Sequence, residues 1–327
     1  MILAGDIGGT KTIIALFEGT AAGLRQLRDA TFPSREHGSL EEILAIFLKD
    51  QAHDSLQVGC FGVAGPVIDG KSKTTNLPWE LDETVLAKAT GTRRVKLLND
   101  LEAAAYGMLH LNGDEFCVLN EGTKPAPVGN IAVIAAGTGL GEAMLIWDGK
   151  QHHPVASEGG HTDFGPTNPE EVELLSFMRD KFGPHVSYER ILSGPGLFDL
   201  YIFLRQSSGT PEPGWLTARI TKGDPSAAVA QVGLSGEDTI AARTLDVFAS
   251  IYGAEAGNLA LKCLAVGGVL IGGGIAPKML PALEQGQFMK GFTAKGRYRG
   301  LMNRIPVKVA LNPRAPLIGA AHYALRL

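Results

Sequence analysis

Two glycine-rich turns constrain the fold of this chain more than any other feature. They are residues 5–12 (GDIGGTKT) and 136–141 (AGTGLG), and each joins two apolar, strand-like runs: 1–4 and 12–17 around the first, 131–136 and 143–147 around the second. Turns of this kind expose backbone N–H groups in a concave nest that can hold phosphate oxygens. Two such hairpins predict a duplicated unit that grips the phosphates of a nucleotide from opposite sides, as in a phosphotransferase.

Composition narrows the class of protein. The chain has 327 residues, of which 45% are hydrophobic, enough for two domains with their own cores. A net charge of -4 offers no basic footprint, so we expect no nucleic-acid partner. No uncharged apolar span reaches about 18 residues, and Asp6 interrupts the apolar start, so we expect no signal peptide, no membrane span and a cytoplasmic location. Cys60, Cys117 and Cys263 lack CxxC spacing and are expected to be reduced core thiols.

Apolar periodicity predicts an alternating α/β order in the first third of the chain. Ser39 and Glu42 form a capping box that predicts a helix start at Leu40. The expected elements are strands 1–6, 12–18 and 23–32, helix 40–52, strand 57–64, helix 82–90, strand 95–98 and helix 101–111. The order is therefore βββαβαβα.

From residue 130 the pattern starts again, with more helix. The expected elements are strands 131–136, 142–147 and 151–157, helices 170–181, 195–206, 224–233 and 236–265, strands 268–271 and 306–311, and helix 314–327. Asn168 and Pro169 are a strong helix start, because Pro169 is pre-set for the first helical position and Asn168 can cap. The second half is thus the larger one and carries helical insertions.

One segment matches a phosphate-binding pattern by accident. Residues 65–72 (GPVIDGKS) fit the P-loop pattern G-x-x-x-x-G-K-[ST]. A P-loop must open a helix at once, but residues 73–79 (KTTNLPW) contain adjacent threonines and a proline. Asp69-Gly70 instead predicts a two-residue hairpin turn.

A polar pair, Asn99 and Asp100, stands where an apolar strand ends and a helix begins. Open α/β sheets bind ligands in the crevice beyond the carboxyl ends of their strands, so this position indicates a site. Asp100 is a candidate base for a hydroxyl that attacks phosphorus, and Asn99 could hold the same hydroxyl. A carboxylate here would also serve as a plain helix cap. Position alone leaves both interpretations of Asp100 open.

Two further segments carry candidate sugar ligands. In residues 158–163 (EGGHTD), Glu158 and His161 flank two glycines that let the backbone approach a ligand closely. A metal site and a plain solvated turn are the alternatives, and the metal site is disfavoured because no cysteine lies nearby. Glu189 is a third carboxylate, which alone would be an ordinary acid near a helix end.

Six segments, in this order and spacing, resemble those of bacterial glucokinases: 6–10 (DIGGT), 98–100 (LND), 137–141 (GTGLG), 158–164 (EGGHTDF), 189–196 (ERILSGPG) and 272–275 (GGGI). The resemblance covers essentially the whole chain. It implies the two-domain actin/hexokinase-like (ribonuclease H-like) α/β fold, with a duplicated βββαβα core and an interdomain cleft. The implied domains are a small one, 1–110, completed by the C-terminal helix 313–327, and a large one, 111–312, with helical insertions.

The resemblance also implies a role for each matching residue. Asp100 would be the catalytic base in ATP-dependent phosphorylation of the glucose 6-hydroxyl. The implied glucose ligands are Asn76, Asn99, Asp100, Glu158, His161 and Glu189, and Asp6 would organise Mg²⁺ through its water shell. The implied ATP-binding residues, besides Asp6, are Gly8, Gly9, Thr10, Lys11, Gly137, Thr138, Gly139, Gly273 and Gly274. A cytoplasmic homodimer is expected.

One departure from the glucokinase pattern keeps alternatives open. Lys11-Thr12 after Gly-Gly-Thr is more typical of the related ROK sugar kinases, whereas other glucokinases have Asn there. The ROK zinc cysteine cluster is nevertheless missing, since residues 165–169 (GPTNP) stand in its place, which favours the zinc-free, non-ROK glucokinase branch. The alternatives are a ROK-like kinase for another hexose or N-acetylated sugar, and a non-catalytic sugar-binding regulator. A regulator would need neither Asp100 nor Asp6.

Overall fold

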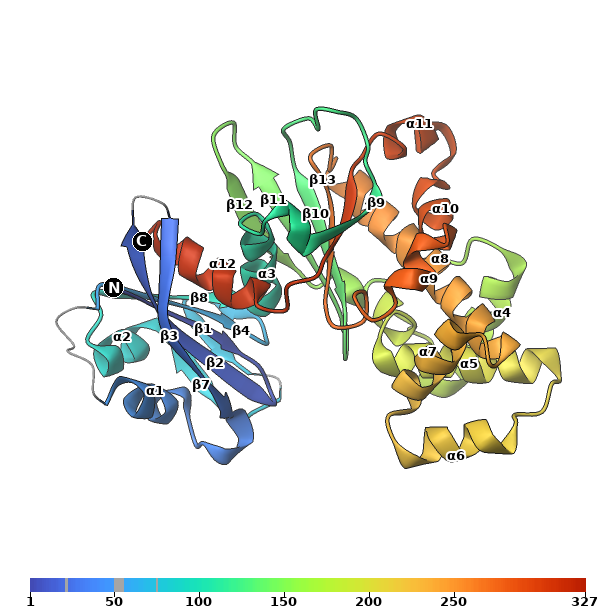
Figure 1. The fold of residues 1–327 in the computed structure, drawn as a ribbon, viewed down its shortest axis with the longest axis horizontal. Helices are drawn as coiled ribbons and strands as arrows, with labels where there is room; N and C mark the ends of the chain where they lie inside the picture. The colour runs from blue at the N-terminus through green and yellow to red at the C-terminus, as the bar shows by residue number, and fades with distance from the viewer. Residues whose placement is uncertain (21–22, 50–55, 75) are drawn as a thin grey trace.

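The structure is a computed structural model that describes residues 1–20, 23–49, 56–74 and 76–327. Two mixed sheets lie side by side, with a mostly helical region beyond the second (Figure 1). The first sheet has the strand order β3-β2-β1-β4-β8. Its strands are β1 (Ile2–Ile7), β2 (Lys11–Thr20), β3 (Gly23–Pro33), β4 (Val58–Val63) and β8 (Arg94–Asn99). β1 runs antiparallel to β2 and parallel to β4.

The second sheet repeats this arrangement in the order β12-β11-β10-β13-β14-β9. Its strands are β9 (Phe116–Asn120), β10 (Ile131–Ala136), β11 (Leu140–Trp147), β12 (His152–Ser157), β13 (Gly268–Gly272) and β14 (Val307–Ala310). β10 runs antiparallel to β11 and parallel to β13, as β1 does to β2 and β4. The predicted duplicated α/β core is therefore confirmed.

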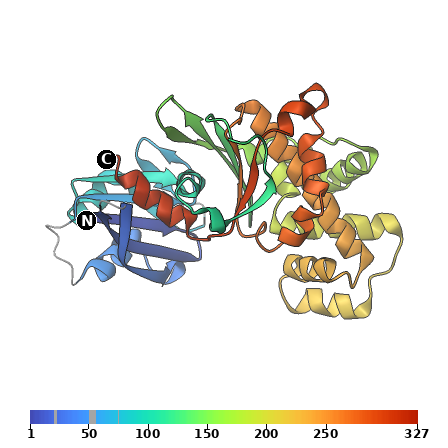
Figure 2. The same ribbon diagram turned by 45° about the horizontal axis from the view of Figure 1, so that its top comes forward.

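Two helices lie where the sheets meet. They are α3 (Asp100–Met108), which contacts β11 and β12, and α12 (Ala315–Ala324), which packs on α3 and β1 (Figure 2). A Cβ at Gly319 would come 1.8 Å from the Ala103 carbonyl oxygen, so glycine permits this close contact between the helices. The C-terminal helix thus returns to the first sheet.

The remaining helices divide between the halves. α1 (Leu40–Leu48) and α2 (Glu83–Thr90) belong to the first, and the Ser39 hydroxyl caps α1 by accepting from the Glu42 N–H. The predicted end of the first helix, residues 50–52, lies outside the described residues. The second half holds α4 (Pro169–Phe182), α5 (Gly194–Ser208), α6 (Gly214–Lys222), α7 (Pro225–Ser235), α8 (Thr239–Lys262), α9 (Leu280–Glu284), α10 (Gln287–Thr293) and α11 (Arg299–Met302).

Some predicted boundaries were wrong, and some elements were not predicted. The long helix α8 does not begin at Gly236, because that residue has φ 72° and ends α7 in a left-handed turn, and Asp238 then caps α8. β9, α6, α9, α10 and α11 were missed. Cys60 and Cys263 are buried free thiols as predicted, but Cys117 is only half-buried, with its Sγ 3.3 Å from Glu284 Oε1.

The P-loop look-alike is a hairpin, as predicted. β5 (Val67–Ile68) and β6 (Lys71–Lys73) pair antiparallel, and β7 (Glu80–Asp82) completes a small sheet. Asp69 and Gly70 have φ values of 50° and 72°, which fits a two-residue hairpin turn.

Among the described residues, no helix is long and apolar enough to span a bilayer.

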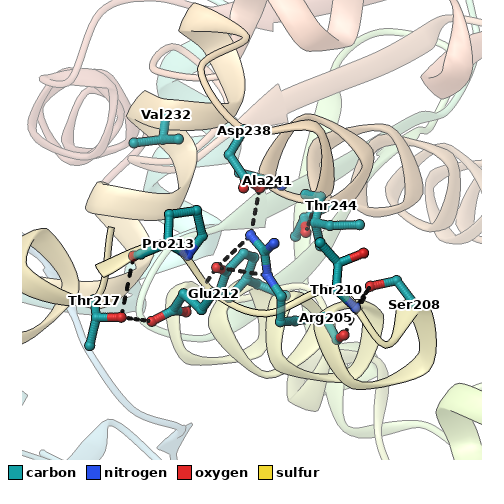
Figure 3. Close-up of polar contacts among 12 residues, drawn as sticks. Arg205, Ser208, Thr210, Glu212, Pro213, Thr217, Val232, Asp238, Ala241 and Thr244 are labelled. Carbon is teal, nitrogen blue, oxygen red and sulfur yellow. Dashed lines mark hydrogen bonds and ion pairs between the residues drawn. The ribbon is translucent and has the colours of Figure 1, made fainter. Parts of the chain in front are cut away.

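A buried ion pair ties α5 to the start of α8 in the helical region (Figure 3). Arg205 donates to Asp238 Oδ1 at 2.6 Å and to the Tyr201 hydroxyl. Burial alone would raise the pKa of Asp238, but the hydrogen bond from Arg205 holds it below its ordinary value. The buried negative charge is thus paired with a guanidinium, as a buried carboxylate requires.

Candidate active site

A pocket of about 750 Å³ lies between the two sheets and collects most of the predicted site residues. A pocket of this volume suits a small-molecule ligand. Its lining includes Asp6, Asn76, Asn99, Asp100, Gly137, Thr138, Gly139, Glu158, His161, Glu189, Gly273 and Gly274. The other four predicted residues, Gly8, Gly9, Thr10 and Lys11, are on the β1–β2 turn and do not line the pocket.

Asn99, not Asp100, caps α3. The helix begins at Asp100, one residue earlier than predicted, and Asn99 Oδ1 accepts from the Leu101 N–H at 2.9 Å. Glu102 completes the capping box by accepting from the Asn99 N–H, and Asn99 Nδ2 donates to the Gly65 carbonyl. Asp100 Oδ1 also accepts from Leu101 N–H at 2.9 Å, so one N–H steers the carboxylate. Capping therefore does not by itself explain the carboxylate at position 100.

Burial raises the pKa of two acids on this wall, Asp100 and Asp6. Burial raises the pKa of Asp100 and the charge of Glu158 adds to the rise, while the Leu101 N–H opposes it. Burial, followed by the charge of Asp100, raises the pKa of Asp6 to about 6, against the lowering effect of Lys11. Two carboxylates that repel each other in one pocket favour the binding of a proton or a cation between them.

The opposite wall carries an imidazole between two carboxylates. His161 Nε2 is 3.9 Å from Glu158 Oε2, and His161 Nδ1 is 3.9 Å from Glu189 Oε1. These separations exceed hydrogen-bond length, so the three groups keep hydrogen-bonding capacity for a ligand. The 3-10 turns η4 (Gly159–His161) and η5 (Tyr188–Arg190) hold them. The described residues contain no group of three or more His, Cys, Asp or Glu placed to hold a metal ion.

The β10–β11 turn is held by two hydrogen bonds, one of them to a pocket residue, and leaves open space beside Gly137. Leu140 N–H donates to Glu189 Oε2 at 2.9 Å, and Gly194 N–H donates to the Gly137 carbonyl at 2.8 Å. A Cβ at Gly139 would come 2.4 Å from Glu189 Oε2, whereas a Cβ at Gly137 or at Gly274 would meet nothing within 4 Å. The glycines therefore leave room for a ligand beside the backbone.

The β1–β2 turn is held by a residue that sequence reasoning missed. Ser34 is buried, donates from Oγ to the Gly8 carbonyl at 2.7 Å, and donates from its N–H to the Thr10 carbonyl at 3.0 Å. A Cβ at Gly9 would come 2.6 Å from the Asn76 Cβ, so the turn lies directly against a pocket residue. No sequence pattern marks Ser34, because its contact depends on the β2–β3 pairing.

Comparisons with known proteins identify the family of the chain. The family model described as Glucokinase matches residues 3–327. The chain is 40% identical to a glucokinase of Nostoc sp., over 100% of this chain and 99% of that relative. It is 41% identical to a glucokinase of Synechocystis sp., over 98% and 96% of the two chains.

A solved structure extends the likeness to three dimensions. The glucokinase from an Antarctic psychrotroph superposes with a TM-score of 0.87 at 32% identity, covering 100% of this chain and 99% of that one. A ROK family glucokinase from Streptomyces griseus, at 21% identity and a TM-score of 0.64, shares the fold. The two-domain hexokinase-like fold predicted from sequence is confirmed. The chain belongs to the glucokinase family.

Proposed function

We propose that this chain transfers the γ-phosphoryl group of ATP to the 6-hydroxyl of glucose, with Asp100 as general base. The observation that carries the proposal is a single pocket in which Asp100 from the first half shares the lining with Glu158, His161 and Glu189 from the second. The glycine turn 137–139 lines the same pocket. A sugar hydroxyl and a nucleotide phosphate could therefore meet at one place.

Asp100 would take the proton from the attacking hydroxyl. Its position at the start of α3 lets the Leu101 N–H orient one oxygen and leaves the other for the substrate. A general base works best when its pKa approaches the operating pH, and burial moves the pKa of Asp100 in that direction.

Asn76, Asn99, Glu158, His161 and Glu189 would hold the sugar hydroxyls. Carboxylate oxygens only accept, whereas amides and imidazole can also donate, so this set can pair hydroxyls in both directions. Glu189 is already committed on Oε2 to Leu140, which fixes its orientation and leaves Oε1 for a hydroxyl. Discrimination among sugars would rest on these pairings, because an unpaired buried polar group is costly.

The pocket fits a magnesium nucleotide. Mg²⁺ is commonly bound by one or two carboxylates plus substrate phosphates and water, and Asp6, which lines the pocket, would supply such a carboxylate. When bound, the ion would neutralise charge on the phosphates. Gly137, Thr138 and Gly139 would face the phosphates, and Gly273 and Gly274 would border the adenosine. Gly8, Gly9, Thr10 and Lys11 would reach the phosphates only after the two halves close.

The division into a small domain, 1–110 with 313–327, and a large domain, 111–312, is part of the proposal. The packing of α12 on α3 and β1, and of β9 on β14, supports it. Closure of these two parts over glucose would exclude water as a competing acceptor. The homodimer and the cytoplasmic location stay predictions.

The product identifies the reaction. With ATP, Mg²⁺ and isotope-labelled glucose, nuclear magnetic resonance should show phosphorus coupled to carbon 6. A phosphorus coupling at another carbon, or no new phosphorus resonance, would refute the proposal.

The alternative of a non-catalytic regulator has one observation in its favour: a ROK family transcriptional regulator has a similar fold, with a TM-score of 0.69 at 17% identity. Such a protein would release no product.

A further inference from the structure

Glu142 places a carboxyl group in the core of the second sheet. Its side chain on β11 is 1% exposed, and its Oε1 has no hydrogen-bond partner among the described residues. The first half holds a buried Ile14 at the matching position of β2, since Gly5 pairs with Ile14 as Ile134 pairs with Glu142. The fold therefore accepts an apolar residue here, and a carboxyl that costs stability points to another use.

A second buried carboxyl faces it. Glu255 of α8 is fully buried and lies within hydrogen-bonding reach of Glu142. Glu255 Oε2 accepts from Asn258 Nδ2 at 2.8 Å, and Oε1 is 3.5 Å from Lys262 Nζ. Two ionised carboxylates offer no donor to each other and repel. One proton on the pair creates an O–H···O hydrogen bond and supplies the donor that Glu142 lacks.

The Arg205–Asp238 pair shows the other way of burying a carboxylate. There a guanidinium donates directly to the acid at 2.6 Å (Figure 3). No ion pair of Glu142 occurs among the described residues, and Lys262, half-exposed, reaches only Glu255. A proton is therefore the natural partner for Glu142.

The pair lies directly behind both segments that carry the proposed sugar ligands. A Cβ at Gly159 would come 2.0 Å from Glu142 Oε2, so the backbone next to Glu158 rests on this carboxyl. On the other side, the Tyr188 hydroxyl accepts from Asn258 Nδ2 at 3.1 Å and lies within hydrogen-bonding reach of Glu255. Tyr188 immediately precedes Glu189. The carboxyl pair thus connects the backbone at 158–161 to that at 188–189.

We propose that Glu142 and Glu255 share one proton and act as positioning residues, holding the segments 158–161 and 188–189 at the spacing that glucose binding requires. This inference rests on the proposed function for its sugar ligands. Loss of the shared proton would leave two like charges in the core, push the Gly159 backbone away and weaken glucose binding.

The surroundings favour loss of this proton in the alkaline range. Burial raises the pKa of Glu142 to about 8, the Glu255 charge adds to the rise, and Lys262 opposes it. Among the described residues, other ionisable groups near the pair are Tyr252 on α8, Tyr188 on η5 and Lys295 after α10. Burial raises the pKa values of Tyr188 and Tyr252 above the ordinary value of tyrosine, so neither hydroxyl ionises near pH 8. Burial lowers the pKa of Lys295, whose Nζ donates to Asn258 Oδ1.

The test is the pH dependence of KM for glucose in the wild type, Glu142→Gln and Glu142→Ala. The wild-type KM should rise on passing about pH 8, while kcat changes less. Glu142→Gln keeps the shape and a permanent donor to Glu255, so its KM should match the wild type at neutral pH and lack the alkaline rise. Glu142→Ala should have a KM about tenfold above the neutral wild-type value, the usual scale for leaving a buried polar partner unpaired, and no alkaline rise. Glu171→Gln, a buried glutamate of α4 outside the pair, is the matched control and should keep the alkaline rise.

Two results would overturn the proposal: an unchanged alkaline rise in Glu142→Gln, or a wild-type KM in Glu142→Ala. An independent readout separates this failure from failure of the proposed function. The infrared difference spectrum between wild type and Glu142→Gln should contain the C=O stretch of a protonated carboxyl that disappears above about pH 8. Its absence at neutral pH would refute the shared proton even if glucose is phosphorylated normally.

Discussion

The two halves of the core use one strand arrangement but place their polar groups differently. In the first half, Asp6 stands one residue before the closing pair Ile7–Thr12 of its hairpin, and in the second half the matching residue is Ala135. Two residues after the closing pair, the relation reverses: Ile14 is apolar and Glu142 is acidic. Each half folds with an apolar residue at the position where the other half has an acid, so the strand arrangement requires neither acid. We therefore infer a separate role for each acid in its own half.

The β1–β2 and β10–β11 turns also differ in the kind of residue that holds them. Ser34, whose side chain is fully buried away from the pocket, holds the four-residue turn of the first half, 8–11. Glu189, itself a proposed sugar ligand, holds the three-residue turn of the second half, 137–139, through Leu140. Under the proposed function, the second half would couple its phosphate turn to its sugar site, and the first half would contribute the base and the metal carboxylate.

The largest effect should come from Asp100, the proposed base in the first half. Asp100→Asn should lower kcat at least about a hundredfold, the usual scale of general acid–base help, while glucose still binds. Steady-state kinetics and calorimetric titration with glucose measure the two quantities separately. Near-normal turnover would make Asp100 a structural residue and would assign the chemistry elsewhere.

Asp6→Asn should have the next largest effect. Removing a carboxylate that holds Mg²⁺ through water should lower kcat/KM for the magnesium nucleotide by about 10- to 100-fold, the scale known for outer-shell metal partners. Raising the Mg²⁺ concentration should restore part of the loss. Asp114→Asn, on the exposed 3-10 turn 113–115, is a control that should change nothing. Equal losses in both variants would contradict the assignment.

A smaller effect is expected when the second half loses one sugar contact. Glucose contacts that bridge both halves should favour a closed form, because a ligand shifts a conformational equilibrium only through contacts that differ between states. Small-angle scattering should report compaction with glucose alone. Glu158→Ala should weaken glucose affinity about tenfold and reduce the compaction. Unchanged dimensions of the wild type at saturating glucose would show that sugar does not bring the halves together.

Much of this molecule was predictable because the repeated pattern is local. The hairpins, the capped helix starts at Ser39 and Asn168 and the strand-end pair at 99–100 depend on neighbouring residues, and the structure shows each of them. β9 was missed because its five residues do not alternate clearly in burial. α9 to α11 were missed because each has only about two helical turns or fewer. Periodicity needs longer segments.

The site was predictable from motifs, but its supporting residues were not. Ser34 and Glu255 act through contacts between distant parts of the chain, which no local pattern reveals. Glu142 carried one weak signal, a carboxylate inside an otherwise apolar strand. Asn99 also shows the limit of position alone, because the sequence left open whether Asp100 merely caps the helix, and the structure assigns the cap to Asn99.

The smallest effect should be a pH dependence of the free energy of unfolding. Glu142 introduces it, and the matching apolar residue Ile14 does not. A carboxyl whose pKa is raised in the folded state takes up a proton on folding between its unfolded pKa, 4.5, and its folded pKa, about 8. Its contribution to stability is full below the lower value and is lost as pH rises through that window, by at most about 1.4 kcal/mol per pH unit. Urea unfolding at several pH values should show this decline in the wild type and a smaller one in Glu142→Gln. Parallel curves would contradict a protonated Glu142.

The central claim is that both halves together make a glucose kinase. The most direct measurement is ADP release in a coupled assay across a panel of hexoses and N-acetylated sugars. We expect Mg²⁺-dependent ADP release with the highest kcat/KM for glucose, and its loss in Asp100→Asn. Preference for another sugar would support the ROK-like alternative, and no sugar-dependent ADP release at all would contradict the account in favour of a sugar-binding regulator.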